Sequence, residues 1–467
     1  MMLPLAMLYH LHTYGCQMNA RDAESVAAAL ESAGWQRASG EADADLILVN
    51  TCSVRDKAEA KALGKLGLLC AAKRDRPHQV VGVLGCMVQR LGGELFKRVP
   101  LLDFAAAPTR YAEVPTLAAR AMTGERALLA HDAQVDDAVW QASPPLAHHL
   151  PGAVSAFITI LLGCNRRCSY CIVPDVRGRE FSRPAREILQ EAEQLVAAGA
   201  REIVLLGQSV MRYGALQPVW SPDTPSPGGF TEPFPRLLEA LDALPGLSRV
   251  RFTSAHPSGC TAELARAFQS FSTLCPHLHL PVQSGANAVL TRMRRGYTRE
   301  AYLESVQRLR AARPDLTLST DVIVGFPGET EADFAQTREL MTTVDFAQAF
   351  LFKYSPRPGT PAAAWHDDVP ETEKIRRHAL LLAEQNARTE RRLHASVGAA
   401  VEVLVEGPSA RNPNVWTGRS PTHAIVLFPP APRIRVGDLL TVCIERAGAQ
   451  ALYGNPLRQT ATPKDTT

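Results

Sequence analysis

Three cysteines lie within eight residues in the segment CNRRCSYC, which covers residues 164–171. Cys164, Cys168 and Cys171 are separated by three residues and then by two. A structural zinc site normally takes four ligands, and a disulfide framework needs an even number of cysteines in an oxidising compartment. Three thiolates instead suit a metal cofactor that keeps one coordination position open.

Three further cysteines, Cys16, Cys52 and Cys86, are far apart in the sequence, but each follows an apolar run that predicts a strand. The runs are YHLHTYGC, LILVNTC and VVGVLGC. Because the carboxyl ends of parallel strands meet at one edge of a sheet, the three thiols are expected to converge there. Three inert core cysteines are the alternative, but three equivalent positions favour a second metal site.

Thiolates are soft ligands that bind iron–sulfur clusters as well as zinc. A [4Fe–4S] cluster held by three cysteines has one iron without a protein ligand, which can bind the amino and carboxylate groups of S-adenosylmethionine (SAM). The CxxxCxxC spacing of residues 164–171 allows one loop to wrap such a cluster. A zinc site that borrows a distant fourth ligand remains an alternative.

The N-terminal cysteines belong to a region, residues 5–110, in which apolar strands alternate with helical patterns. This alternation predicts a parallel α/β sheet. The segment ARDAESVAAALESAG is expected to be a helix with Asn19 as its N-cap. Residues 111–152 carry Pro, Ala and His without a clear period and are expected to form a linker.

The cluster loop at 164–171 opens a second series of strands and helices over residues 153–387. This series predicts a partial (β/α)₆ barrel, whose functional loops lie at the carboxyl ends of its strands. A loop rich in Pro and Gly, residues 217–235, is inserted in it. The expected strands are Ala156–Leu162, Glu202–Gly207, Arg249–Ser254, His277–Pro281, Leu316–Gly325 and Ala349–Tyr354.

A long basic helix is expected near residues 371–395, and the pattern then changes to short strands. Residues 388–450 predict a small β-barrel, and residues 451–467 a tail. Residues 388–467 hold ten Lys or Arg against six Asp or Glu, whereas the whole chain carries a net charge of +3. This concentration of positive charge favours a nucleic-acid partner.

The composition of the 467-residue chain, 46% hydrophobic and 21% charged, is typical of a globular protein with two or three domains. No run approaches the ~20 apolar residues that span a bilayer. The opening MMLPLAMLYH lacks the basic region and cleavage site of a signal peptide, so a cytoplasmic protein without a membrane partner is expected. The cysteines that match no motif are expected to be ordinary thiols: Cys70, Cys260, Cys275 and Cys443.

From about Leu8 to Arg446 the sequence resembles the radical SAM methylthiotransferases. That family has an N-terminal α/β domain with a second cluster, a partial (β/α)₆ barrel and a C-terminal RNA-binding β-barrel called TRAM, so an α/β fold of these three parts is expected. The branch that acts on isopentenyladenosine (dimethylallyladenosine) in tRNA is the most similar. The motifs that indicate it are TYGCQMN, NTCSVRDKA, GCNRRCSYCIVP and RGRE followed by SRP. Other branches act on threonylcarbamoyladenosine in tRNA or on an aspartate of a ribosomal protein.

The resemblance implies two [4Fe–4S] clusters and two molecules of SAM per turnover. Cys164, Cys168 and Cys171 would hold the cluster that cleaves SAM, giving a radical that abstracts hydrogen from C2 of adenosine 37. Cys16, Cys52 and Cys86 would hold the cluster that provides sulfur, and a second SAM would supply the methyl group. The implied partners are the tRNA anticodon loop and a reductase or a flavodoxin- or ferredoxin-type electron donor, and a monomer is expected.

Several short motifs after the expected barrel strands match SAM contacts of this family. Gly207 and Gln208, in LLGQS, would lie near the methionine amino group. Gln283 and Ser284, in LPVQSG, are candidates for the ribose. DVIVGFPGE resembles a motif whose glycines allow close approach of the adenine. Its candidate residues are Asp321, Gly325, Gly328 and Glu329, and YSPRPGTPA would complete the wall.

Arginines near the cluster loop and in the C-terminal region are candidate RNA contacts. Arg177, Arg179 and Arg183 follow the loop, although pairing within the protein is the more common role of such arginines. ARNPNVWTGRSP resembles the TRAM signature, with Arg411, Trp416 and Arg419 as candidates, and a core position for Trp416 is equally expected.

The sequence departs from the family pattern at Asp175, Ser209 and Met211, and in GRSPTHAIVLF, which bears on substrate contacts. Two other classes of protein remain as alternatives. A non-catalytic, zinc-containing RNA-binding protein would hold zinc without sulfide. A plain SAM methyltransferase would add carbon but no sulfur, and no glycine-rich loop after the first strand supports it.

Overall fold

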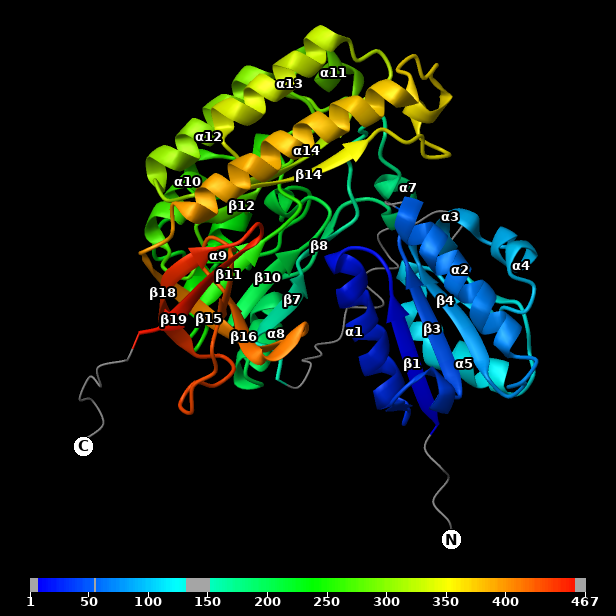
Figure 1. The fold of residues 1–467 in the computed structure, drawn as a ribbon. Coiled ribbons are helices and arrows are strands. Elements are labelled where there is room, and N and C mark those ends of the chain that lie inside the picture. Colours follow the sequence, from blue (N-terminus) through cyan, green and yellow to red (C-terminus); the bar gives the residue numbers. More distant parts are fainter. Residues whose placement is uncertain (1–6, 54–55, 132–151, 458–467) are drawn as a thin grey trace, which may run out of the picture.

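The computed structural model describes residues 7–53, 56–131 and 152–457. Figure 1 shows three parts, an N-terminal α/β domain, a half-barrel of strands covered by helices, and a small C-terminal barrel that lies against the half-barrel. Among the described helices, none is long and apolar enough to cross a membrane.

The N-terminal domain is a six-stranded sheet with the order β2-β1-β3-β4-β5-β6, in which all neighbours are parallel. The central strands β3 and β4 are buried along their whole length, as a sheet covered on both faces requires. The strands are β1 Leu8–Thr13, β2 Gln36–Arg37, β3 Leu46–Thr51, β4 Val80–Gly85, β5 Phe104–Ala106 and β6 Leu128–Ala130. The helices are α1 Gln17–Ser32, α2 Asp56–Ala72, α3 Cys86–Leu91, α4 Glu94–Arg98 and α5 Val114–Met122, with short 3₁₀ turns at Glu41–Asp43 and Pro108–Glu113.

The prediction of a linker over residues 111–152 is wrong for its first part. Helix α5 and strand β6 belong to this segment, and β6 pairs in parallel with β5 as the sixth strand of the sheet. The buried side chains of α5, such as Leu117, pack on one face of the sheet and hold the helix there. Residues 132–151 of the predicted linker lie outside the described residues.

The half-barrel contains the six predicted strands in the predicted order. Strands β7, β10 and β11 form one parallel sheet, and β12, β13 and β14 form another. A bridge between Val250 and Leu274 connects the two sheets. The strands are β7 Ser155–Thr159, β10 Glu202–Leu206, β11 Arg249–Phe252, β12 His277–His279, β13 Thr317–Val324 and β14 Gln348–Lys353.

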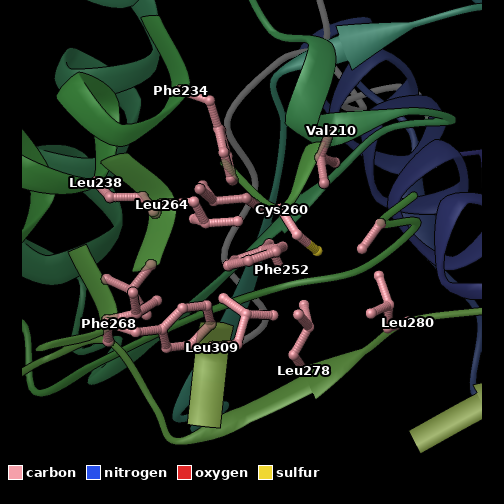
Figure 2. Packing of buried hydrophobic residues seen from close by; sticks show 14 of the residues in the cluster. Val210, Phe234, Leu238, Phe252, Cys260, Leu264, Phe268, Leu278, Leu280 and Leu309 are labelled. Carbon is pink, nitrogen blue, oxygen red and sulfur yellow. The ribbon is translucent and has the colours of Figure 1, made fainter. Parts of the chain in front are cut away.

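A layer of helices covers the outer face of these strands (Figure 1). Figure 2 shows the core between them, where Phe252, Leu278 and Leu280 meet Phe268 and Leu309 from the helices. The helices are α7 Val173–Arg177, α8 Ala185–Ala197, α9 Pro233–Asp242, α10 Ala262–Ser270, α11 Asn287–Arg292, α12 Arg299–Ala312, α13 Glu331–Val344 and α14 Glu371–His394. A short hairpin, β8 Leu161–Leu162 with β9 Phe181–Ser182, encloses the cysteine loop. Further 3₁₀ turns lie at Val210–Arg212, Pro257–Gly259 and Pro361–Ala364.

The C-terminal domain is a closed five-stranded barrel, β15-β16-β17-β19-β18. Its strands are β15 Ala400–Ser409, β16 Asn412–Arg419, β17 Ile425–Phe428, β18 Leu439–Ala447 and β19 Ala451–Pro456. The predicted boundaries 388–450 are therefore wrong at both ends. Helix α14 continues to His394, and β19, assigned to the tail, closes the barrel by pairing with β17 and β18. The rest of the tail, residues 458–467, lies outside the described residues.

All ten cysteines lie in the described residues and carry thiols rather than disulfides. Of the four without a motif, Cys260 packs in the barrel core among Phe252 and Leu264 (Figure 2), and Cys70 packs in the N-terminal core. Cys275 is buried and Cys443 is partly buried on β18. These positions agree with ordinary thiols.

Candidate active site at two cysteine triads

The N-terminal triad, Cys16, Cys52 and Cys86, follows three adjacent parallel strands. Cys52 and Cys86 come directly after β3 and β4, and Cys16 comes three residues after β1. Cys16 is the N-cap of α1, and Cys86 is the first residue of α3. The predicted convergence of the three thiols at one edge of the sheet is confirmed.

Asn19 connects two of these cysteine loops. Its Oδ1 accepts hydrogen bonds from the backbone nitrogen of Cys16 at 3.2 Å and from its thiol at 3.3 Å. Its Nδ2 donates to the carbonyl of Thr51 at 2.9 Å, directly before Cys52. The prediction of Asn19 as N-cap is wrong, because the helix begins at Gln17 and Asn19 lies in its first turn, where its fully buried side chain joins two strand ends.

The electrostatic environment differs between members of this triad. A hydrogen bond with Cys52 lowers the pKa of Cys16 to about 6, which favours its thiolate. Burial raises the pKa of Cys86, and the nearby Arg177 guanidinium is the main influence against that rise. The edge of the sheet therefore carries one thiol that ionises readily and one whose ionisation is assisted by an arginine.

The second triad, Cys164, Cys168 and Cys171, lies in the loop between β8 and α7. The loop is held by backbone bonds, from the nitrogen of Cys164 to the carbonyl of Gly178 at 3.0 Å and from the nitrogen of Cys171 to the carbonyl of Cys168 at 3.1 Å. Burial, together with the neighbouring Cys168 and Cys164, raises the pKa of Cys171 to about 12. The three thiols therefore share one local environment, as ligands of one metal group would.

The spread of the thiols distinguishes the two cofactor alternatives. Zinc binds thiolate sulfur at about 2.3 Å, so two sulfurs on one zinc ion lie within about 4.6 Å of each other. Among the described residues, which include all six cysteines, the one set of three ligand atoms within 4.8 Å of one another is His10, His12 and Glu41. The triads are thus wider than a single zinc ion allows and fit a cluster, whose cysteines bind different irons. In the His10 set, the Glu41 carboxylate already forms an ion pair with the Lys65 ammonium at 2.5 Å, so it is not proposed as a metal site.

Gln208 lies beside the second triad. Its Oε1 accepts a hydrogen bond of 2.5 Å from the backbone nitrogen of Gly163, directly before Cys164. Gly207 lies close to the same loop, because a Cβ at this position would come within 2.7 Å of the Leu161 carbonyl. Both predicted residues therefore lie at the base of the cysteine loop, and Gln208 supports it directly.

Gln283 and Ser284, the candidates for the ribose, differ in backbone conformation and in the surroundings of their side chains. Gln283 has a left-handed φ of 70°, and its nitrogen donates to the carbonyl of Asp321 at 2.9 Å. Ser284 is fully buried, with its hydroxyl 3.3 Å from that of Thr337. Its hydroxyl is thus enclosed between this loop and α13, and the contact of Ser284 with the ribose stays a prediction.

The DVIVGFPGE segment presents one side chain inside the half-barrel. Asp321 is partly exposed and lies 3.3 Å from His279 Nε2. Glu329 is instead buried, pairs with Arg377 at 2.8 Å and accepts a hydrogen bond of 2.6 Å from the nitrogen of Gly325. Gly325 and Gly328 both have positive φ. A Cβ at Gly325 would come within 2.3 Å of a Lys374 side-chain carbon, so close packing requires this glycine before any ligand is considered.

Two of the three arginines predicted to contact phosphates are buried. Arg177 is 3% exposed and pairs with Asp22, and Arg183 is 5% exposed and pairs with Glu191. The prediction of phosphate contacts is therefore wrong for both, and pairing within the protein is confirmed. Arg179 is exposed.

In the C-terminal barrel, Arg411 is exposed on the connection between β15 and β16. Trp416 is partly buried against the barrel core. Arg419 donates to Glu406 at 2.8 Å, and its carbonyl accepts a hydrogen bond from Arg249 of the half-barrel at 2.6 Å. Arg411 is thus the most accessible of the three candidate RNA contacts.

Two arginines donate hydrogen bonds to cysteines of the triads, and the sequence analysis did not predict either contact. Arg177 Nε donates to Cys86 Sγ at 3.2 Å, and Arg295 Nη1 donates to Cys168 Sγ at 3.5 Å. Arg295 is 7% exposed and also donates to the carbonyl of Pro281 at 3.2 Å. The segment MRRGY around Arg295 carries no spacing signal, because its contact with Cys168 spans 127 residues.

Comparisons with known proteins agree with this geometry. Residues 158–341 match the Radical SAM superfamily, and residues 8–107 match a family described as Uncharacterized protein family UPF0004. The fold resembles that of the radical S-adenosylmethionine methyltransferase TsrM from Kitasatospora setae, solved with cobalamin and a [4Fe-4S] cluster. The TM-score is 0.55 at 14% identity, over 77% of each chain. The half-barrel and its cysteine loop are those of a radical SAM enzyme.

The more similar relatives cover nearly the whole chain. A tRNA-2-methylthio-N(6)-dimethylallyladenosine synthase from Opitutus terrae is 43% identical, over 95% of this chain and 96% of that protein. The enzyme of the same name from Akkermansia muciniphila is 42% identical, over 96% and 98%. The chain belongs to the family of tRNA-2-methylthio-N(6)-dimethylallyladenosine synthases, and its cofactors are SAM and [4Fe–4S] clusters.

Proposed function

We propose that the protein methylthiolates C2 of N6-isopentenyladenosine at position 37 of tRNA, next to the anticodon, to give 2-methylthio-N6-isopentenyladenosine. The observation that carries this proposal is the presence of two cysteine triads in a chain of this family, one at the carboxyl ends of three parallel strands and one in the loop after β8. The names of the relatives favour this substrate over the alternatives, threonylcarbamoyladenosine in tRNA and an aspartate of a ribosomal protein.

Each triad is assigned one [4Fe–4S] cluster in this proposal. Cys164, Cys168 and Cys171 would hold the barrel cluster, at which SAM would bind, and Cys16, Cys52 and Cys86 would hold the second cluster. When bound, the barrel cluster supplies the electron that cleaves SAM, and the second cluster supplies the sulfur, with two SAM molecules consumed per turnover.

The protein's own residues position these ligands. Gln208 fixes the backbone before Cys164, and Asn19 joins the loops of Cys16 and Cys52. Asp321, inside the half-barrel, and Gln283, beside it, are the polar residues proposed to orient SAM. Glu329 is proposed to act indirectly. Its carboxylate accepts a hydrogen bond from the nitrogen of Gly325 and so supports that loop, and the pair with Arg377 holds the carboxylate in place.

The tRNA anticodon loop is the proposed partner, since single-stranded loops expose their bases to proteins. Exposed Arg179 and Arg411 are the proposed phosphate contacts. The protein is proposed to act in the cytoplasm as a monomer, with electrons from a reductase or a flavodoxin- or ferredoxin-type protein.

The test is mass spectrometry of nucleosides from tRNA of a host that lacks its own methylthiotransferases. With this protein, we expect a new 2-methylthio-N6-isopentenyladenosine peak that disappears in Cys16→Ala and in Cys168→Ala. Cys443→Ser, which changes a partly buried thiol outside both triads, is the matched control and keeps the peak. A methylthio group on threonylcarbamoyladenosine, or no methylthio nucleoside from a protein with both clusters, would contradict the proposed substrate.

A further inference from the structure

Arg177 connects the two cysteine triads across the boundary between the N-terminal domain and the half-barrel. Helix α7 begins at Val173, two residues after Cys171, and ends at Arg177. The guanidinium of Arg177 reaches the other domain, where Nε donates to Cys86 Sγ at 3.2 Å. A residue of the helix that follows one triad thus contacts a thiol of the other. Figure 1 shows α7 next to α3, the helix that Cys86 begins.

The contact lies in an enclosed environment. Arg177 Nη2 donates to Asp22 Oδ2 of α1 at 2.5 Å, and the Tyr111 hydroxyl donates to the same oxygen at 3.3 Å. Ile172, directly before α7, and Val176 within it pack with Cys86 as a small buried cluster. Because water is largely excluded, the positive charge of Arg177 acts strongly on the sulfur atom.

The Asp22 pair alone does not explain the position of Arg177, because a second ion pair already joins the same two domains. Arg21, the residue before Asp22, donates to Glu191 of α8 at 2.7 Å, and Arg183 donates to the other oxygen of Glu191 at 2.7 Å. This second network is equally buried, and its Arg183 donates to Glu191 and to the carbonyl of Thr159 rather than to a cysteine. The contact with Cys86 is therefore what distinguishes Arg177 from its neighbour Arg183.

We propose that Arg177 is a positioning residue for the second cluster, which fixes Cys86 against the loop of the barrel triad and stabilises negative charge on its sulfur. The inference rests on the proposed function, because it takes Cys86 as a ligand of that cluster. Hydrogen bonds and positive charge at a ligand sulfur favour the reduced cluster and raise its reduction potential. A change at Arg177 should consequently act on the cluster of the other domain.

The experiment isolates one cluster at a time. A parent variant in which Cys164, Cys168 and Cys171 are all replaced by Ala retains the second triad alone and is reconstituted anaerobically with iron and sulfide. Its midpoint potential is measured by a redox titration followed by electron paramagnetic resonance. Arg177→Gln is expected to shift this potential to a more negative value, and Arg177→Lys to recover part of the shift. Arg183→Gln, the matched buried arginine, is expected to leave it unchanged.

A reciprocal parent, with Cys16, Cys52 and Cys86 replaced by Ala, shows whether the effect is specific. Arg177→Gln should leave the potential of the barrel cluster unchanged there, which also shows that this variant folds. The inference is overturned if Arg177→Gln leaves the second cluster's potential unchanged, or if Arg183→Gln shifts it equally. If the first parent binds no cluster at all, the assignment of Cys16, Cys52 and Cys86 fails, and the proposed function fails with it.

Discussion

At the scale of single residues, Gly163 sets the conformation of the loop that carries the second triad. It precedes Cys164, has a left-handed φ of 73°, and a Cβ at this position would lie 1.9 Å from the Arg179 carbonyl oxygen. Gly163→Ala should therefore destabilise the protein by roughly 2–5 kcal/mol, from backbone strain and overpacking together. Urea denaturation of the apoprotein and the iron content after reconstitution measure the effect.

Gly199→Ala is the matched control for this prediction. Gly199 also has a positive φ, 109°, but nothing lies within 4 Å of the Cβ that alanine would add. Gly199→Ala should lower the free energy of unfolding by about 1–2 kcal/mol, from backbone strain alone, and leave cluster binding unchanged. Equal losses in the two variants would mean that the contact with Arg179 has no part in positioning the loop.

The cysteines could be placed from the sequence, whereas the arginines that contact them could not. Cys16, Cys52 and Cys86 each follow an apolar run, so local pattern and the geometry of parallel sheets are sufficient to place them, and the barrel cysteines share one short loop. Arg177 stands in a polar segment that looks solvated and its carboxylate partner lies on another element, whereas the contact of Arg295 with Cys168 spans 127 residues. A signal exists at Arg21 and Asp22, two adjacent charges on a helix whose other buried residues are mainly apolar, but it does not name their partners.

At the scale of elements, strong hydrophobic patterns predicted strands well and weak ones did not. The six barrel strands are confirmed because each is an apolar or alternating segment between clear helices. Strand β6 is three residues long, and β19 contains a Gly, an Asn and a Pro, so neither has a recognisable period of its own. Both are strands because neighbouring strands pair with them.

The position of β19 predicts the effect of shortening the chain. A chain that ends at Gln450 lacks the strand that pairs with β17 and β18, so the barrel would have two open edges and lose the buried Leu452. We expect the C-terminal barrel to unfold, with rapid proteolysis after α14 and loss of tRNA binding. Limited proteolysis and a tRNA gel-shift assay measure these effects.

A chain that ends at Leu457 keeps all five strands and is the control for this truncation. It should resist proteolysis as the full chain does. If the shorter chain, ending at Gln450, were equally resistant, the barrel would not depend on β19 and the boundary at residue 450 would be correct after all.

At the scale of the whole molecule, the C-terminal barrel is joined to the inner side of the half-barrel by buried polar groups. Arg251 of β11 donates to the carbonyls of Ser420 at 2.8 Å and Pro421 at 2.9 Å, in the turn that follows β16. The imidazole of His423, from the same turn, stacks on that of His277 with ring centroids 4.9 Å apart. The two domains therefore meet at two imidazoles next to an arginine.

Burial lowers the pKa of both histidines, and nearby positive charge lowers it further, so that the pKa of His423 is about 4 and that of His277 is well below its usual value. The two imidazoles are thus neutral near pH 7. The other charged or titratable groups that face the pair are Glu202 of β10, Arg251 of β11, His279 of β12 and Arg419 of β16.

These lowered pKa values predict that acid weakens the junction of the two domains. Between about pH 6.5 and pH 4, histidines in the separated or unfolded state bind protons and those in the folded state do not. Stability is therefore complete above about pH 6.5 and falls as the pH drops, by roughly 1–3 kcal/mol across this range. Thermal denaturation at a series of pH values measures the slope. His423→Asn, whose side chain tolerates the left-handed φ of 72°, should flatten it, whereas exposed His394→Asn should not. Equal slopes for the wild type and His423→Asn would show that the stacked pair does not set the acid sensitivity.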